Sequence, residues 1–288
     1  MNSPKSPSSR SFPPGTRLLA LALVPLSDPA APSLGASGVG DRKPVERASR
    51  TPKTLDELAP QVDAPSDLHL LLVPADEAEQ ATWGHDLRET LNERFAAPGM
   101  PCTVLQVPGA VLAHTQRALA VCAEHERMEP IARAALEGAC IEHELRELEV
   151  AIEQGWGPMK QAAPLAFEFD ERSLVRRSEL SAHFVALVEL RSRLARLSPR
   201  ILAPQVYPPT LASQVSERLR ERLRLAERLE AASSRLEAQE RVFEMCGQRL
   251  TEVALASRGH ALEWIIIVLL SAQTVLWIVE MLGSGDLG

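Results

Sequence analysis

The sequence has little of what nucleic-acid binding usually requires. Aromatic residues make up only 4% of its 288 residues, and Tyr207 is the single tyrosine, so stacking platforms for single-stranded nucleic acid are not expected. Basic residues are fewer than acidic residues, so the formal net charge is −7. A nucleic-acid binder instead needs a concentrated basic surface. We therefore expect no direct sequence-specific contact with nucleic acid.

Cysteine is also scarce, and its spacing excludes the commonest cysteine-based sites. The chain has four cysteines, with no C-x-x-C pair among them. Structural zinc sites need clustered ligands, and widely spaced cysteines of this kind behave as small hydrophobic residues in a reducing compartment. The four are Cys102, Cys122, Cys140 and Cys246.

No catalytic arrangement can be assigned either. No serine lies in a strand-turn-helix elbow, and GASGVG at Gly35–Gly40 lacks the strand and helix that flank a phosphate-binding loop. His143 and Glu147 are four residues apart and would share a helix face, with Cys140 three residues before His143. A third convergent ligand is missing, so an intrahelical pair explains this spacing more simply than a metal site. We expect no catalytic residue, no metal, no cofactor, and a protein that is not an enzyme.

The N-terminal region, residues 1–66, is rich in Pro, Ser and Gly. Such a composition cannot bury enough apolar surface to offset the loss of conformational entropy, so we expect most of this region to be disordered. The exception is TRLLALALVPL, Thr16–Leu26. This run is either a strand or the apolar part of a targeting signal, and the sequence leaves both open.

A small α/β module is expected at residues 67–110, followed by a helical domain at residues 111–257. The module is indicated by a compact apolar run, a segment with helical spacing, and a second compact run. These three segments are Leu68–Pro74, Asp76–Ala96 and Cys102–Pro108. In the helical domain, apolar residues recur at helical spacing through Ile131–Gln154, through Ser173–Leu202, and through a last helix at 211–257.

The last of these helices carries a heptad repeat. Leu229, Leu236, Phe243 and Leu250 recur every seven residues, and Gln239 is a polar residue in the complementary seam. Four such repeats are typical of a coiled coil, in which Gln239 would help to fix the register. The pattern predicts a homo-oligomer with this seam at its centre. A helical hairpin closed within one chain explains the same spacing equally well.

The segment at residues 261–282 is long and apolar enough by composition to suggest a transmembrane helix. About 20 mostly apolar residues cross a bilayer, and Trp264 and Trp277 lie near the two ends, where indole rings favour the membrane interface. Glu263 and Glu280 lie at the margins. We therefore expect the lipid bilayer to be a partner of this segment.

The charges that flank the segment suggest an orientation. Arg241, Arg249 and Arg258 precede it, and no Lys or Arg follows it. The positive-inside rule then predicts a single-pass membrane protein with its N-terminal bulk in the cytoplasm, or in the matrix if the membrane is the mitochondrial inner membrane. The expected fold class is α+β: a small N-terminal α/β module, a long helical hairpin or coiled coil, and one C-terminal transmembrane helix.

The C-terminal residues resemble a known family. SRGHALEWIIIVLL followed by the acidic residue in WIVEML is similar to the C-terminal signature of the "required for meiotic nuclear division" family, once catalogued as a domain of unknown function. IARAALEGACIEHELRELE and RRSELSAHFVALVELRSRL resemble helices that precede it in that family. The family includes a mitochondrial inner-membrane protein that supports organellar translation, fungal sporulation relatives and many bacterial members. The resemblance implies no catalytic residues.

The function expected from these patterns is that of a non-enzymatic, membrane-anchored scaffold or assembly protein. The resemblance adds support of translation or membrane-associated organisation as its role. Two alternatives stay open: a soluble helical module that binds other proteins, and an unrecognised enzyme that uses the α/β module.

Overall fold

The computed structural model describes residues 11–25, 42–58, 67–97, 101–166, 177–203 and 210–284. The chain divides into two compact units. The first comprises residues 1–151 and 191–233, and the second comprises residues 152–190 and 234–288.

The first unit contains a six-stranded mixed sheet. Its strands lie in the order β2-β1-β3-β6-β5-β4. The pairing of β3 with β6 is parallel, and each of the other neighbouring pairs is antiparallel. The strands are β1 (Arg17–Pro25), β2 (Arg42–Arg50), β3 (Asp67–Pro74), β4 (Thr103–Val107), β5 (Ala110–His114) and β6 (Ala118–Ala123).

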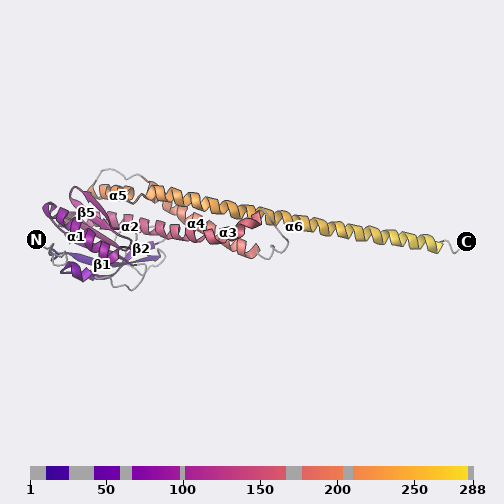
Figure 1. Ribbon diagram of the computed structural model, residues 1–288, viewed down its shortest axis with the longest axis horizontal. Coiled ribbons are helices and arrows are strands. Elements are labelled where there is room, and N and C mark those ends of the chain that lie inside the picture. Colours follow the sequence, from indigo (N-terminus) through magenta and orange to yellow (C-terminus); the bar gives the residue numbers. More distant parts are fainter. Residues whose placement is uncertain are drawn as a thin grey trace, which may run out of the picture. The chain divides into compact units, whose positions relative to one another are not determined.

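One face of this sheet packs against α1 (Glu77–Phe95), which lies beside the strands in Figure 1. Because side chains alternate between the two faces of a strand, every second residue points toward this helix. The shared core joins Trp83 and Leu87 of α1 to Leu71 of β3 and Val111 of β5. The ring of Phe12 stacks on Trp83 with centroids 5.3 Å apart, so the first described residues belong to this core.

The opposite face of the sheet packs against α2 (His125–Gln154). The intervening strand positions, such as Leu70, Leu112 and Val121, are buried on this side. Burial on both faces explains why β5 and β6 are buried at every position, and apolar at every position except His114, rather than alternating. On α2, Ile131 and Leu145 are fully buried, as an amphipathic helix on a sheet requires.

The remaining elements are helical. The short ones are the 3-10 turns η2 (Leu55–Leu58) and η3 (Ala163–Ala166) and the helix α3 (Trp156–Ala162). The longer ones are α4 (Arg177–Leu202), α5 (Leu211–Arg222) and α6 (Leu225–Ser284), and α6 runs on as one continuous helix (Figure 1).

The single helix expected at residues 211–257 is in fact two helices. α5 begins at a capping box, in which the Thr210 side chain accepts a hydrogen bond from the Ser213 N–H. It ends before Arg224, whose φ of 53° is left-handed and cannot continue a right-handed helix. α6 starts at the next residue.

The N-terminal prediction also needs correction. Where the sequence indicated disorder over residues 1–66, the structure describes residues 11–25 and 42–58 and places β1 and β2 there. Within the apolar run at Thr16–Leu26, for which a strand was one of the two alternatives, Arg17–Pro25 form the strand β1, paired on both sides. Residues 1–10, 26–41 and 59–66 lie outside the described residues. Because β1 lies between β2 and β3, its backbone groups are paired by residues far along the chain, which local composition does not reveal.

The boundary between the α/β module and the helical domain was also misplaced. Residues 110–123 form β5 and β6 rather than the start of a helical domain at residue 111. Both strands are rich in alanine and buried on two faces, so they lack the alternation by which a strand is normally recognised. The expected α+β fold class is thus replaced by a mixed α/β fold around a six-stranded sheet.

The predicted transmembrane helix at residues 261–282 is contradicted. Within the part of the chain that the structure describes, no helix is both long and apolar enough to cross a membrane. The segment carries Glu263, Ser271, Gln273 and Thr274 among its apolar residues, which lower its mean hydropathy. The single-pass membrane localisation was derived from this helix and is contradicted with it, whereas the bilayer as a partner stays an untested prediction.

Candidate functional site

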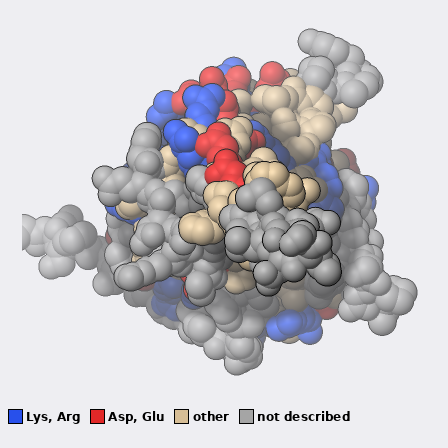
Figure 2. Space-filling view, turned by 90° about the vertical axis from the view of Figure 1, so that its right-hand side faces the viewer, with Lys and Arg blue, Asp and Glu red and all other residues tan. Residues whose placement is uncertain are grey.

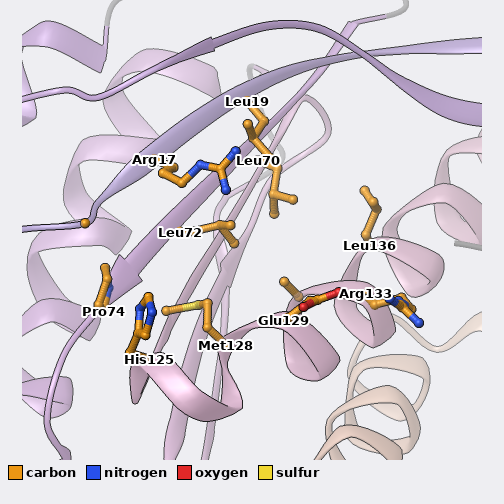
Figure 3. Close-up of a pocket in the computed structure, with 12 residues that line it drawn as sticks. Arg17, Leu19, Leu70, Leu72, Pro74, His125, Met128, Glu129, Arg133 and Leu136 are labelled. Carbon is orange, nitrogen blue, oxygen red and sulfur yellow. Dashed lines mark hydrogen bonds and ion pairs between the residues drawn. The ribbon is translucent and has the colours of Figure 1, made fainter. Parts of the chain in front are cut away.

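A pocket opens on the α2 face of the sheet in the first unit (Figure 3). Its volume is about 370 Å³, within the range of small-molecule sites. β1 and β3 supply one wall, with Arg17 directly opposite Leu72 and Leu19 opposite Leu70 across the strand pair. Paired residues in an antiparallel ladder project on the same side, so all four side chains face the pocket. α2 supplies the other wall through Met128, Ala132 and Leu136.

Charged groups lie around the apolar floor of this pocket. Glu129 and Arg133 of α2 form an ion pair at 3.0 Å, so their charges offset each other. Arg17 is different, because no carboxylate among the described residues pairs with it. Figure 3 shows its guanidinium reaching between the Leu19–Leu70 pair and Leu72. The pocket therefore offers an apolar surface with one uncompensated cation.

A second polar feature lies between α2 and α6, in the first unit. Arg228 of α6 makes two hydrogen bonds to Glu149, at 2.9 Å and 2.6 Å, and one to Glu142 at 3.0 Å. Glu142, 1% exposed, also accepts from Arg146. The hydrogen bonds to Glu149 raise the pKa of Arg228 above its ordinary value. These four residues carry balanced charge and no open cavity, so they act as a polar connection between the two helices.

His114, at the end of β5, lies near this connection. Burial lowers the pKa of His114 from 6.5 to about 4, although the charge of Glu142 acts in the opposite direction. Arg146 and Arg228 lower it further. The imidazole is therefore neutral near pH 7. Nothing in the sequence around His114 marks it as buried, because its neighbours Glu142 and Arg228 come from distant segments.

The predicted oligomer seam is covered by the chain itself where its side chains are described. Leu229, Leu236 and Phe243 are 6%, 0% and 5% exposed. The ring of Phe243 lies 5.9 Å from that of His183 on α4. Leu250 falls outside the residues whose side chains the structure describes. The heptad spacing thus corresponds to packing within the chain, and its role in a homo-oligomer stays an untested prediction.

Gln239 has an intramolecular partner as well. Its Nε2 donates a hydrogen bond to the Ile152 carbonyl oxygen at 2.7 Å, within the second unit, and the side chain is fully buried. This polar residue therefore fixes α6 against the end of α2 in the same chain. Its partner lies 87 residues away along the sequence, which is why heptad spacing alone did not reveal it.

Two of the residues considered for a metal site, His143 and Glu147, form a partly buried pair on α2. His143 Nε2 lies 3.5 Å from Glu147 Oε1, and Arg193 of α4 lies 3.6 Å from the same carboxylate. Cys140 is buried, and burial raises the pKa of its thiol to about 12. No group of three or more metal-ligating side chains converges within the described part of the chain.

The most exposed apolar surface belongs to α6. Trp264 and Trp277, expected at a membrane interface, are 68% and 64% exposed. Between them the large apolar side chains are at least half exposed. In the end view of Figure 2, acidic and basic side chains lie intermixed on the described surface rather than gathered by sign. Apolar character, not charge, distinguishes this part of α6.

Comparisons with known proteins give little further guidance. No protein-family model matches the chain, and no curated protein matches it. Among solved structures, the chain is similar to the full-length CmaX protein, at 13% identity and a TM-score of 0.40, over 88% of this chain and 82% of that one. A likeness at this level supports no inference about function. The similarity to the "required for meiotic nuclear division" family, which rests on the C-terminal signature and two preceding segments, stays an untested prediction.

Proposed function

We propose that this protein is a non-enzymatic scaffold that assembles with further copies of itself through residues 262–277 of α6. The observation that carries the proposal is the exposure of this segment. Its large apolar side chains are between 51% and 69% exposed. They are Leu262, Trp264, Ile265, Ile266, Ile267, Val268, Leu269, Leu270, Val275, Leu276 and Trp277.

The exposed surface extends around the whole helix. Ile265–Leu270 are six consecutive apolar residues, and at 3.6 residues per turn they point in every direction from the axis. Full burial of one such side chain contributes about 1.5–3 kcal/mol. Contiguous apolar surfaces of this kind mark interaction sites in proteins. A single partner stripe would leave much of this surface in water, so several helices are needed to cover it.

The polar residues inside the segment are compatible with burial. The Ser271 hydroxyl donates to the Ile267 carbonyl oxygen at 2.7 Å, and the Thr274 hydroxyl donates to the Leu270 carbonyl oxygen at 2.8 Å. Because each hydroxyl already has a partner within the helix, covering it leaves no unmade hydrogen bond. Gln273, which is exposed, could bond to a neighbouring helix.

A second copy of the chain fits this surface better than an unrelated partner does. Glu263 is the only charged residue in 262–277, so charge complementarity cannot select a partner, and the partner surface must itself be apolar. The same segment of another copy is such a surface, and two helices of this kind can pack side by side. Identical copies also form closed symmetric assemblies, in which each helix contacts two neighbours.

The proposal is tested by the oligomeric state of the full chain. We expect sedimentation equilibrium in a non-ionic detergent to show a discrete assembly of several copies. Ile266→Glu combined with Leu270→Glu places two charges one turn apart on the exposed segment and should reduce the assembly to monomers. The matched control is Val185→Glu with Val188→Glu, since these α4 residues are 63% and 50% exposed and lie outside the segment.

Three outcomes would overturn the proposal. The first is a monomeric wild-type chain, and the second is an assembly that both double variants leave intact. The third is a monomer that binds to lipid vesicles through the same segment without self-association. Circular dichroism of each variant checks that loss of assembly does not reflect unfolding.

The family resemblance implies a further role, support of translation, which goes beyond self-assembly. An assembly of this kind could support translation, as the resemblance implies, if the body of each subunit contacts the translation machinery. Two alternatives, a helical module that binds other proteins and an enzyme that uses the α/β module, do not require self-association, so a monomeric wild-type chain would favour them over this proposal.

A further inference from the structure

The pocket between β1, β3 and α2 is separate from the exposed segment of α6, and the inference drawn from it does not depend on the proposed function. Its floor is formed by side chains that are nearly covered by protein yet line the opening: Leu19, Leu70, Met128 and Leu136 are 3%, 3%, 7% and 2% exposed. Leu72 and Pro74, of intermediate burial, complete the apolar surface.

The charge at this pocket is set by Arg17. Its strand position opposite Leu72 places it on the pocket face, and Figure 3 shows the guanidinium over the apolar floor rather than turned away from it. The other charged lining residues, Glu129 and Arg133, pair with each other at 3.0 Å. The net charge that a ligand meets is therefore positive.

A second hydrogen-bond donor lies at the other end of the apolar floor. His125 is the first residue of α2, and in Figure 3 its ring stands beside Met128 and Pro74. A ring N–H of His125 can donate to an anion in either protonation state. The pocket thus combines a row of aliphatic side chains with donors suited to a carboxylate.

We propose that this pocket binds an amphipathic carboxylate, with an unbranched aliphatic chain along Leu19, Leu70 and Leu136 and its head group on Arg17. Arginine suits this role because its planar fork matches both oxygens of a carboxylate. The volume of about 370 Å³ accommodates a chain of medium length rather than a long-chain lipid.

The test uses decanoate as the probe and the full chain with ¹³C-methyl-labelled methionines. Met128 is one of six methionines, and its methyl signal is assigned with Met128→Leu. We expect decanoate, below its micelle concentration, to shift the Met128 signal saturably. Decyltrimethylammonium, with the same tail and the opposite charge, should not shift it, and butyrate should bind much more weakly.

Two variants separate the contributions of head group and tail. Arg17→Gln should weaken decanoate binding at least about tenfold, because the charged hydrogen bonds are lost. Leu72→Trp should block the tail without changing the charge. The matched control is Arg127→Gln, since Arg127 pairs with Glu124 at 3.4 Å and does not line the pocket, and it should bind decanoate like the wild type.

The inference is overturned if decanoate leaves the Met128 signal unmoved or if Arg17→Gln binds it as tightly as the wild type. It is also overturned if decyltrimethylammonium binds equally well. Binding to the apolar segment of α6 instead would change the fluorescence of Trp264 and Trp277 without shifting Met128, and would likewise contradict it. Thermal unfolding of each variant shows whether a loss of binding reflects a loss of folding.

Discussion

Arg228 of α6 binds Glu149 of α2 through two parallel hydrogen bonds, from Nε to Oε1 at 2.9 Å and from Nη2 to Oε2 at 2.6 Å. Its third nitrogen donates to Glu142, which is 1% exposed. One guanidinium therefore binds two carboxylates, one of which has almost no access to water, and Arg146 supplies the second positive charge. The packing of α2 on α6 in the first unit depends on this arginine.

Replacing Arg228 by methionine should destabilise the protein by about 2–3 kcal/mol. The variant keeps most of the side-chain volume but leaves Glu149 without its bidentate partner and Glu142 with only Arg146. Urea unfolding of the full chain measures the change. The matched control is Arg218→Met, because Arg218 and Glu221 form an exposed pair at 3.4 Å and such pairs contribute less than about 1 kcal/mol. Equal effects of the two substitutions would contradict the assigned role of Arg228.

The burial of the His114 side chain predicts that the protein loses stability in mild acid. Because burial lowers its pKa from 6.5 to about 4, the unfolded chain binds more protons than the folded chain between these values. Stability is therefore fully present above about pH 6.5 and falls as the pH falls toward 4, by about 3 kcal/mol in total. The difference between wild type and His114→Leu, measured by urea unfolding across this range, isolates the contribution. A difference that does not vary with pH would refute it.

The four cysteines should be unreactive in the folded protein. All are buried and free, and burial raises the pKa of Cys102 to about 11 and that of Cys140 to about 12, so little thiolate forms at about pH 8. We expect a thiol-specific disulfide reagent to modify no cysteine before unfolding and all four in denaturant. Rapid modification of Cys246, whose pKa is also raised by burial, would show that α6 separates locally from its neighbours.

Alanine substitutions at two neighbouring glycines, Gly155 and Gly157, should change the free energy of unfolding in opposite directions. A Cβ on Gly155 would lie 3.1 Å from Cδ of Gln239 and closer still to its Oε1, and Gln239 cannot retreat without losing its hydrogen bond to Ile152. Gly155→Ala should therefore cost about 1–3 kcal/mol. Gly157 in α3 has no neighbour within 4 Å of such a Cβ, and Gly157→Ala should stabilise by about 0.5–1 kcal/mol. Urea unfolding distinguishes the two, and equal effects would argue against the packing of Gln239.

Local patterns in the sequence correctly predicted several helices and strands. The strand at Leu68–Pro74, the helix at Asp76–Ala96 and the strand at Cys102–Pro108 correspond to β3, α1 and β4. Each has flanking breakers and a periodicity that depends on neighbouring residues alone. The apolar character of residues 264–277 of α6 was equally plain from the sequence, although no helix among the described residues is long and apolar enough to cross a membrane.

Only the tertiary structure decided the rest, because the deciding contacts join distant segments. β1 is a strand since β2 and β3 pair with both its edges, and β5 and β6 are strands since helices cover both faces of the sheet. The heptad positions Leu229 and Leu236 are buried within the chain. Heptad spacing alone cannot distinguish packing within one chain from packing against a second copy. The pocket exists because Arg17 and Leu72, 55 residues apart by number, occupy paired positions in the sheet. The sequence shows which side chains are apolar, charged or polar. Strand pairing and helix packing determine which of these side chains come into contact.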